Sequence, residues 1–522
     1  MRKIKVISLY LIVVLMFFLV RQTVAMARTD DVRFTLTQSQ IDMINESVES
    51  SMAAGKIPGV SLAIVSGSEV IYAKGFGYAD VRNRIKVTMD TIFELGSNSK
   101  AFTGLAMLKL ESEGLIDFSA PVEDYIPWLE MRYNGEKAVV TVEQVMNHTS
   151  GIPFRSIDKI PESIADDALE ETVRTLIGIE LQTRPGASYS YATINYNILG
   201  LIIELQTGQS YEAYMTENIL NPIGLTNTYM FREDTGTEMA TGYKINFLRA
   251  REFDAPIYRG NIPAGYILSS GNDMALWMMK QLGFHDDNTF DQSLIDRSHD
   301  VEFGAPLQQE SDVSYTMGWF VNRLTKETFH SGSNPNFSSN IRLDPENGMG
   351  IAVLANLNTP FTEEIALNVR DIIQGFEPSI FETPDMFLLL DRVAVMVICV
   401  SIGVILFMIV LIARLIMKIK KKQRFFARPN SKGIMVICFL TAFLALLAFF
   451  VTQLPRMFFD GIGWRTAAVW GPGTLLSAVA FTGLATLLIC LYLEASICLI
   501  NDMAWMMNQK KKRSKNRWKS TS

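Results

Sequence analysis

The chain has 522 residues, 48% of them hydrophobic, with a formal net charge of -6, four Cys and four His. This length allows a large domain with further segments, and it excludes a small disulfide-stabilised scaffold. Residues 28–390 are rich in Asp and Glu, whereas Lys and Arg gather at both ends. An acidic body argues against a nucleic-acid partner, because phosphate binding needs a basic surface.

The distribution of cysteine and histidine excludes further chemistries. All the cysteines lie in the C-terminal third, at Cys399, Cys438, Cys490 and Cys498. Residues 28–390 therefore contain neither a disulfide nor a thiolate nucleophile. Because the chain has only four His and no His-Glu-x-x-His motif, we expect no metal centre.

Residues 1–27 have the organisation of a secretory signal peptide. Basic residues at the start precede an apolar run, and the segment ends in the small-residue triplet Ala25-Met26-Ala27. The run is short for a membrane span, so cleavage after Ala27 is the preferred interpretation, with an uncleaved N-terminal anchor as the alternative. Either form places the following residues outside the cytoplasm.

Three later apolar runs are long enough to cross a bilayer, and their loops differ in charge. The loop after the first run and the C-terminal tail are strongly basic, whereas the loop between the second and third runs is not. The positive-inside rule therefore places the basic loop and the tail in the cytoplasm. Glu494 is the one acid within a run, and three largely apolar helices do not favour transport.

These patterns predict a multi-pass protein of the cell membrane whose main domain is extracytoplasmic. In chain order the predicted segments are a signal peptide 1–27, the main domain 28–384, a linker 385–392, a span 393–413, a cytoplasmic loop 414–433, a span 434–454, an external loop 455–474, a span 475–495 and a cytoplasmic tail 496–522.

The main domain mixes strand and helix patterns. Two hairpins are predicted near its ends, from residues 59–76 and 340–355, where apolar runs flank turn sequences. Helical patterns cover residues 102–113, 195–205 and 363–376. The simplest architecture is an α+β domain in which both ends of the sequence form one antiparallel sheet and a helical region is inserted between them.

One candidate nucleophile stands where the helix 102–113 begins. Ser97 and Lys100 form a Ser-x-x-Lys pattern, and residues three apart share one face of a helix. A desolvated Lys can take the proton of a serine hydroxyl, and the free N–H groups of a helix start can stabilise an oxyanion. For Ser97 alone, a helix cap beside a solvated Lys is the more common arrangement. A second copy, Ser156 to Lys159, is predicted to be a surface loop.

Two further segments add to this pattern. Tyr191 stands at the edge of a loop that leads into the helix 195–205, and a phenol beside a Lys can act as general base and acid, although a buried Tyr is usually a core ring. His330-Ser331-Gly332 reads as a strand whose small residues allow a substrate to approach the backbone. His330 by itself is an ordinary polar side chain.

With these segments in order, residues 57–374 resemble the serine β-lactamase and penicillin-binding-protein superfamily, and most closely its class C β-lactamase, DD-peptidase and esterase branch. Ser97 and Lys100 match its Ser-x-x-Lys element, Tyr191-Ala192-Thr193 aligns with Tyr-x-Asn, and His330-Ser331-Gly332 matches Lys-Thr-Gly or His-x-Gly. The segments beginning at Asn147, Asn221 and Pro263 also look familial. His148, within the first of these, is predicted to be structural.

The resemblance implies a β-lactamase-like antiparallel sheet flanked by helices, and it implies no cofactor. It assigns the attack on a carbonyl to Ser97, management of its proton to Lys100 and Tyr191, and the oxyanion site to the backbone N–H groups of Ser97 and Ser333. His330, Gly332 and Thr193 are then expected at the substrate-binding site.

Two departures from the family pattern affect the expected substrate. Thr193 replaces an Asn whose amide would contact substrate and Lys100, and His330 replaces the Lys of penicillin-recognising members. Both reduce the expectation of β-lactam hydrolysis and suit ester or amide substrates that lack a carboxylate.

The leading hypothesis is a membrane-anchored extracytoplasmic serine hydrolase that forms an acyl-enzyme with a D-amino-acid peptide or ester, or another small ester or amide, linked to the cell wall. The alternative is a catalytically weak or silent penicillin-binding-like receptor or partner of membrane proteins, motivated by Thr193 and by three spans where one would anchor. Membrane lipid is an expected partner in both, and protein partners of the spans are left open.

Overall fold

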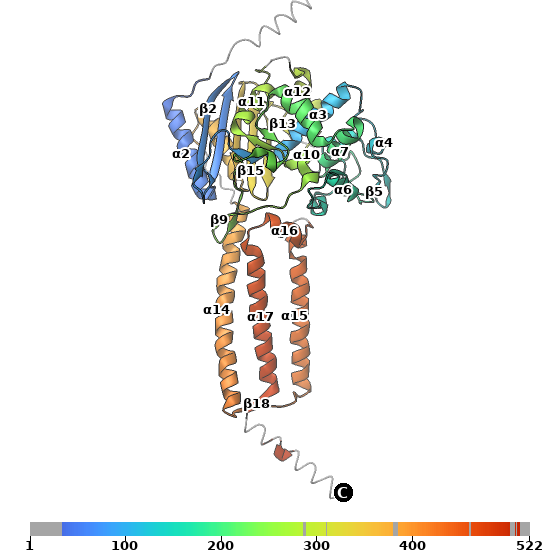
Figure 1. Cartoon of the computed structure of the whole chain (residues 1–522). Helices are drawn as coiled ribbons and strands as arrows, with labels where there is room; N and C mark the ends of the chain where they lie inside the picture. The colour runs from blue at the N-terminus through green and yellow to red at the C-terminus, as the bar shows by residue number, and fades with distance from the viewer. Residues whose placement is uncertain are drawn as a thin grey trace, which may run out of the picture.

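A large α and β body lies at one end of three long helices in the computed structural model (Figure 1). The structure describes residues 34–285, 289–308, 311–378, 385–458, 461–501, 507 and 509–511. The predicted signal peptide, 1–27, lies outside these residues.

A nine-stranded antiparallel sheet forms the centre of the body. Strand β1 is buried along its whole length, and it pairs with β16 on one side and β2 on the other. Both ends of the domain sequence therefore build one sheet, as predicted. In spatial order the strands are β11 (Ala305–Pro306), β12 (Val313–Thr316), β13 (Trp319–Asn322), β14 (Thr328–Asn334), β15 (Phe337–Asp344), β16 (Met349–Ala355), β1 (Gly59–Ser66), β2 (Glu69–Asp80) and β3 (Ile85–Lys86).

Two helices cover one face of this sheet. Helix α2 (Gln38–Gly55) begins with a capping box between Thr37 and Gln40. Helix α13 (Phe361–Ile373) turns Ile365 and Val369 into the core against the strands. The helix predicted at 363–376 is confirmed, although it starts two residues and ends three residues earlier.

The opposite face carries the inserted helical region. Helix α11 (Gly271–Gln281) packs on β1 and β16, and α3 (Ser99–Ser112) is buried on nearly all sides, with Phe102 stacked on Trp277 at 3.9 Å between ring centroids. The remaining helices here are α4 (Val122–Tyr125), α5 (Val142–Met146), α6 (Ala168–Arg174), α7 (Asn195–Thr207), α8 (Tyr211–Met215), α9 (Asn221–Ile223), α10 (Ile262–Gly265) and α12 (Gln292–Ser298). The small strands are β4 (Ile92–Glu94), β5 (Met131–Tyr133), β6 (Glu136–Ala138), β7 (Thr228–Tyr229), β8 (Tyr243–Asn246), β9 (Arg249–Glu252) and β10 (Leu268–Ser270).

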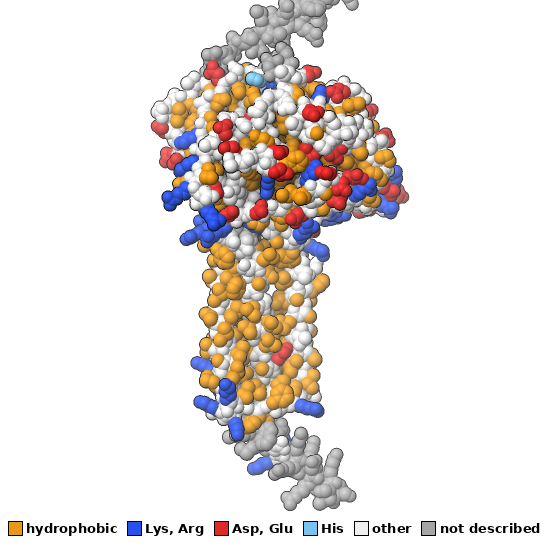
Figure 2. Space-filling view, in the orientation of Figure 1, with side chains coloured by type: hydrophobic (Ala, Val, Ile, Leu, Met, Phe, Trp, Pro, Cys, Tyr) orange, Lys and Arg blue, Asp and Glu red, His pale blue; other side chains and the backbone are white. Residues whose placement is uncertain are grey.

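Three helices are long and apolar enough to cross a membrane: α14 (Met386–Lys420), α15 (Ser431–Phe458) and α17 (Thr474–Cys498). They run side by side, with α17 in contact with both others, and β17 (Arg424–Phe426) pairs with β18 (Leu499–Asn501) at the far end. Apolar side chains cover this column in Figure 2, and Lys and Arg lie at both of its ends.

The helix α14 begins earlier than the predicted span. It starts at Met386, where the Asp385 carboxylate accepts hydrogen bonds from the N–H groups of Phe387 and Leu388. The residues predicted as a linker, 385–392, therefore form its first turns. Leu388 belongs to the same buried apolar cluster as residues of α2 and α13, so the first turn of α14 packs against the body.

Candidate active site

Ser97 lies in a tight turn between β4 and α3. The turn Gly96–Asn98 is a 3-10 helix, and Gly96 adopts a φ of +54°, in the left-handed region that favours glycine. A Cβ atom on Gly96 would lie 2.4 Å from the amide nitrogen of Ser333. Glycine is thus required both by conformation and by space, and the turn sits directly against β14.

Lys100 lies one helical turn beyond Ser97, as the spacing predicted. Its Nζ donates to Ser97 Oγ at 3.1 Å and to the Ala264 carbonyl at 2.6 Å. The side chain is fully buried, and this burial lowers the pKa of Lys100 well below its usual value. A neutral amine in this position can accept the serine proton.

Tyr191 completes the cluster from a loop before α7. Its hydroxyl donates to Ser97 Oγ at 2.9 Å. Burial raises the pKa of Tyr191 above its ordinary value, and its hydrogen bonds with Ser97 and Thr193 only partly oppose that rise. The phenol therefore stays protonated, which suits it to donate or relay a proton rather than to begin as a phenolate base.

Strand β14 faces the Ser97 turn along one edge. Neighbouring strand β13 pairs with it only at Thr328 and Phe329. Beyond these residues Gly332 approaches so closely that a Cβ would lie 2.0 Å from the Leu95 carbonyl oxygen. The Asn334 side chain then donates to Glu94 Oε2 at 2.6 Å, which ties the end of β14 to β4. The backbone of Ser333 is thereby held beside Ser97.

His330 has a different position from the one expected of a substrate contact. It is 2% exposed, and its Nδ1 lies 2.7 Å from the Ser331 carbonyl oxygen. Burial, together with the nearby Lys100, lowers the pKa of His330 to about 3. The ring is neutral and does not line the cavity described below, so it supplies no fixed positive charge to a substrate carboxylate.

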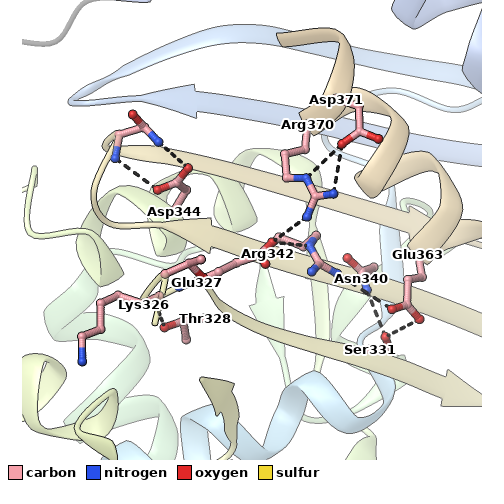
Figure 3. Close-up of polar contacts among 12 residues, drawn as sticks. Lys326, Glu327, Thr328, Ser331, Asn340, Arg342, Asp344, Glu363, Arg370 and Asp371 are labelled. Carbon is pink, nitrogen blue, oxygen red and sulfur yellow. Dashed lines mark hydrogen bonds and ion pairs between the residues drawn. The ribbon is translucent and has the colours of Figure 1, made fainter. Parts of the chain in front are cut away.

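The middle residue of this motif, Ser331, contacts α13 (Figure 3). Its hydroxyl donates to Glu363 Oε2 at 3.4 Å and accepts from Asn340 Nδ2 at 3.0 Å. Nearby, the Arg342 guanidinium pairs with Glu327 at 2.8 Å. These contacts join β14, β15 and α13, and they hold the strand that carries Ser333 in place.

A buried aromatic group positions Tyr191. The His148 ring lies 4.3 Å from the Tyr191 ring, and its Nδ1 accepts from Asn195 Nδ2 at 2.9 Å. The His148 side chain is fully buried, and the structural role expected for it stays a prediction. Tyr315 packs against both rings, and sequence reasoning missed it because it comes from β12, far along the chain, with no motif around it.

A cavity of about 400 Å³ opens beside the Ser97 hydroxyl. Its polar side contains four residues of the expected site, Ser97, Tyr191, Thr193 and Ser333. The rest of its wall is almost entirely apolar and comes from Phe154, Ile157, Met386, Phe387, Leu390, Ile462, Thr466, Ala467, Trp470, Gly471 and Leu475.

The second Ser-x-x-Lys copy, Ser156 to Lys159, was predicted to be a surface loop, and the structure corrects this prediction. Phe154–Lys159 is a 3-10 helix and not a surface loop, and Ser156 is buried. Lys159 Nζ donates instead to the Thr175 carbonyl at 3.2 Å. The segment contacts residues 461–466, about 300 positions later in the chain, which its local polar sequence did not indicate.

Residues 44–375 match the family model described as Beta-lactamase. The chain belongs to this family. It is 30% identical over 467 residues to "Protein flp" of Staphylococcus aureus (strain N315), covering 88% of this chain and 92% of the relative. It is 31% identical over 261 residues to the "Putative penicillin-binding protein PbpX" of Bacillus subtilis (strain 168), covering 49% and 61%.

Among solved structures, the chain is similar to the octameric penicillin-binding protein homologue from Pyrococcus abyssi. The TM-score is 0.57 at 29% identity, covering 68% of this chain and 81% of the other. The resemblance inferred from the motifs is confirmed, and so is the β-lactamase-like fold. The similarity to the staphylococcal relative covers 88% of this chain, which is more than residues 1–384, so it extends into the three long apolar helices.

Proposed function

We propose that this protein is a membrane-anchored serine hydrolase that works through an acyl-enzyme on the outer side of the membrane. The observation that carries the proposal is the convergence on Ser97 Oγ of Lys100 Nζ at 3.1 Å and the Tyr191 hydroxyl at 2.9 Å. Members of the matched family are usually serine hydrolases, which supports the same assignment.

The geometry suggests a division of labour among these groups. As Ser97 Oγ bonds to the substrate carbonyl carbon, the neutral Lys100 amine takes its proton. The N–H groups of Ser97 and Ser333 stabilise the resulting oxyanion. When the bond to the leaving oxygen or nitrogen breaks, the proton passes from Lys100 through the Tyr191 hydroxyl to that atom. Water then hydrolyses the acyl-enzyme, which releases the acid and restores Ser97.

The site favours esters or amides without a carboxylate beside the scissile bond. His330 is neutral and buried where penicillin-recognising relatives are expected to offer a Lys, and Thr193 contacts Tyr191. D-amino-acid esters fit this requirement, and so do other esters, amides or peptides whose leaving group carries no free carboxylate. The basic loop 414–433 and tail support an orientation with the body outside the cytoplasm.

The direct test uses the full chain in lipid nanodiscs, with p-nitrophenyl acetate and a D-alanyl ester as substrates. We expect hydrolysis by the parent protein, loss of at least about 10⁴-fold in Ser97→Ala, and parental rates in Ser156→Ala, which alters the other Ser-x-x-Lys copy. A folded parent protein that hydrolyses neither substrate, or an active Ser97→Ala protein, would contradict the proposal. The first of these results would favour the silent receptor.

A further inference from the structure

The cavity at Ser97 is completed by the membrane part of the chain. Met386, Phe387 and Leu390 come from the first turns of α14, and Leu475 comes from the first turn of α17. Ala467 and Trp470 come from α16 (Trp464–Trp470), the short helix between the body and the bundle (Figure 1). The reactive serine therefore lies at the end of the body that meets the membrane helices.

Specific polar contacts hold α16 in this place. Asp158 of the body accepts hydrogen bonds from the Gly463 N–H at 3.2 Å and from the Thr466 hydroxyl, at the start of α16. At the other end, Lys244 Nζ donates to the carbonyl oxygens of Ala468 at 2.7 Å and Val469 at 2.9 Å. Both charges have the sign that complements the helix dipole at their end.

Further contacts fix α14 and α17 against the same surface. Asp391 of α14 accepts from the Leu248 N–H at 2.6 Å and from the Thr474 hydroxyl at 2.5 Å. The Gly473 N–H donates to the Ile245 carbonyl at 3.0 Å. These buried bonds make the cavity wall a built part of the site rather than a chance apposition.

The shape and polarity of the cavity indicate what it holds. Its volume of about 400 Å³ falls in the range of small-molecule sites, and its polar atoms gather at the Ser97 end. Met386 lines it and is 56% exposed, so the apolar end reaches the surface where α14 leaves the body. An occupant with a carbonyl at one end and an apolar chain at the other would satisfy both ends.

We propose that the cavity binds the acyl chain of a membrane-resident ester or amide, so that the substrate is an amphiphile whose scissile carbonyl reaches Ser97 from the bilayer surface. This inference rests on the proposed hydrolase function. It assigns substrate selection to α14, α16 and α17, and it gives the three membrane helices a part in the site beyond anchoring. Ser97 Oγ forms the acyl bond, the alcohol or amine leaves with the proton, and water releases the fatty acid.

The test measures kcat/KM for p-nitrophenyl esters from acetate to laurate with the full chain in nanodiscs. Each buried methylene raises kcat/KM by up to about fourfold. We therefore expect kcat/KM for the octanoate ester to exceed that for the acetate ester by more than tenfold. Long esters also concentrate in the lipid of the nanodisc, which raises their apparent kcat/KM. This partitioning is the same for every variant, so a comparison between matched variants cancels it. Leu390→Trp fills the cavity and should lower the octanoate-to-acetate ratio at least tenfold.

Leu389→Trp is the matched control, because Leu389 is the adjacent residue of α14, is 42% exposed and does not line the cavity. It should keep the parental ratio. Leu475→Trp narrows the same cavity from α17 and replaces Leu390→Trp if that variant does not fold. Equal ratios in the cavity variants and in Leu389→Trp would overturn the acyl-chain site while leaving a Ser97-dependent hydrolase intact.

A binding measurement separates this result from failure of the proposed function. Nanodiscs that contain the Ser97→Ala protein should bind more radiolabelled laurate than empty nanodiscs do. Adding Leu390→Trp to this protein should weaken its affinity for laurate at least tenfold. If no ester is hydrolysed, the hydrolase proposal fails on its own. If laurate binds both proteins equally, or neither, the acyl-chain site fails.

Discussion

The two sides of the cavity differ in how they are assembled. The polar side comes from the body, where Ser97 and Lys100 are set by one helical turn and Ser333 by the adjacent strand β14. The apolar side comes from α14, α16 and α17, and it depends on contacts between residues hundreds of positions apart, such as Asp158 with Thr466. In the function proposed above, the reaction type is set by the body and the choice of substrate by α14, α16 and α17.

Removal of the base should have the largest effect on the polar side. Lys100→Met should lower kcat/KM for a short ester by about 10³ to 10⁴-fold, because no other amine reaches Ser97 Oγ among the described contacts. Steady-state hydrolysis in nanodiscs measures this. Lys159→Met changes the Lys of the other Ser-x-x-Lys copy and should leave the rate unchanged. Equal activity in the two variants would mean that Lys100 only supports the fold.

Removal of the phenol should have a smaller effect on the same side. Tyr191→Phe keeps the ring that packs on His148 but deletes the hydroxyl that donates to Ser97. We expect a loss of about 10² to 10³-fold in kcat, with little change in KM. Tyr189→Phe, two residues away and outside the cavity lining, is the control. A loss confined to KM would argue that Tyr191 binds substrate and does not relay a proton.

Acid should inactivate the site through Lys100. Burial lowers the pKa of this amine, so the neutral form persists below pH 10.5, its usual pKa, and protonation at still lower pH removes the base. We expect kcat/KM to fall about tenfold per pH unit on the acid side of that lowered pKa. This acid limb of the pH–rate profile should stay at the same pH in His330→Gln, because the pKa of His330 is already about 3. A limb that moves with this substitution would assign it to His330.

Loosening the apolar side should give the smallest effect. Asp158→Ala removes the acceptor for the Gly463 N–H and the Thr466 hydroxyl. These hydrogen bonds stabilise the position of α16 by about 1 kcal/mol. Their loss should raise KM for the octanoate ester about fivefold. Asp167→Ala, beside the start of α6, removes an exposed carboxylate whose side chain makes no cap hydrogen bond. Identical KM values for the two variants would show that α16 does not depend on Asp158.

The sequence predicted the parts of the molecule that depend on local patterns. The two hairpins, the helices α3, α7 and α13, and the three long apolar helices follow from periodicity and turn residues. Ser97 and Lys100 meet because three residues make nearly one helical turn. Tyr191 was a candidate from its place at the edge of a loop before a helix, but its pairing with Ser97 came from the family resemblance, since the contact spans 94 positions.

The remaining parts depend on tertiary contacts that local patterns do not report. Met386 to Leu390 were interpreted as a linker, yet they line the cavity, and Ser156 was assigned to a surface loop although it is buried. His330 was expected at the substrate, but its ring turns into the core beside Tyr315. In each case the environment is set by a segment distant in the chain.

The most direct test of the central claim is the intact mass of the full chain after exposure to a small fluorophosphonate. If Ser97 is the activated nucleophile, its oxygen displaces fluoride, and the parent protein should gain the mass of one phosphonyl group. Ser97→Ala should gain none, and Ser156→Ala should react like the parent. A folded parent protein without an adduct, or an equal adduct in Ser97→Ala, would contradict the account.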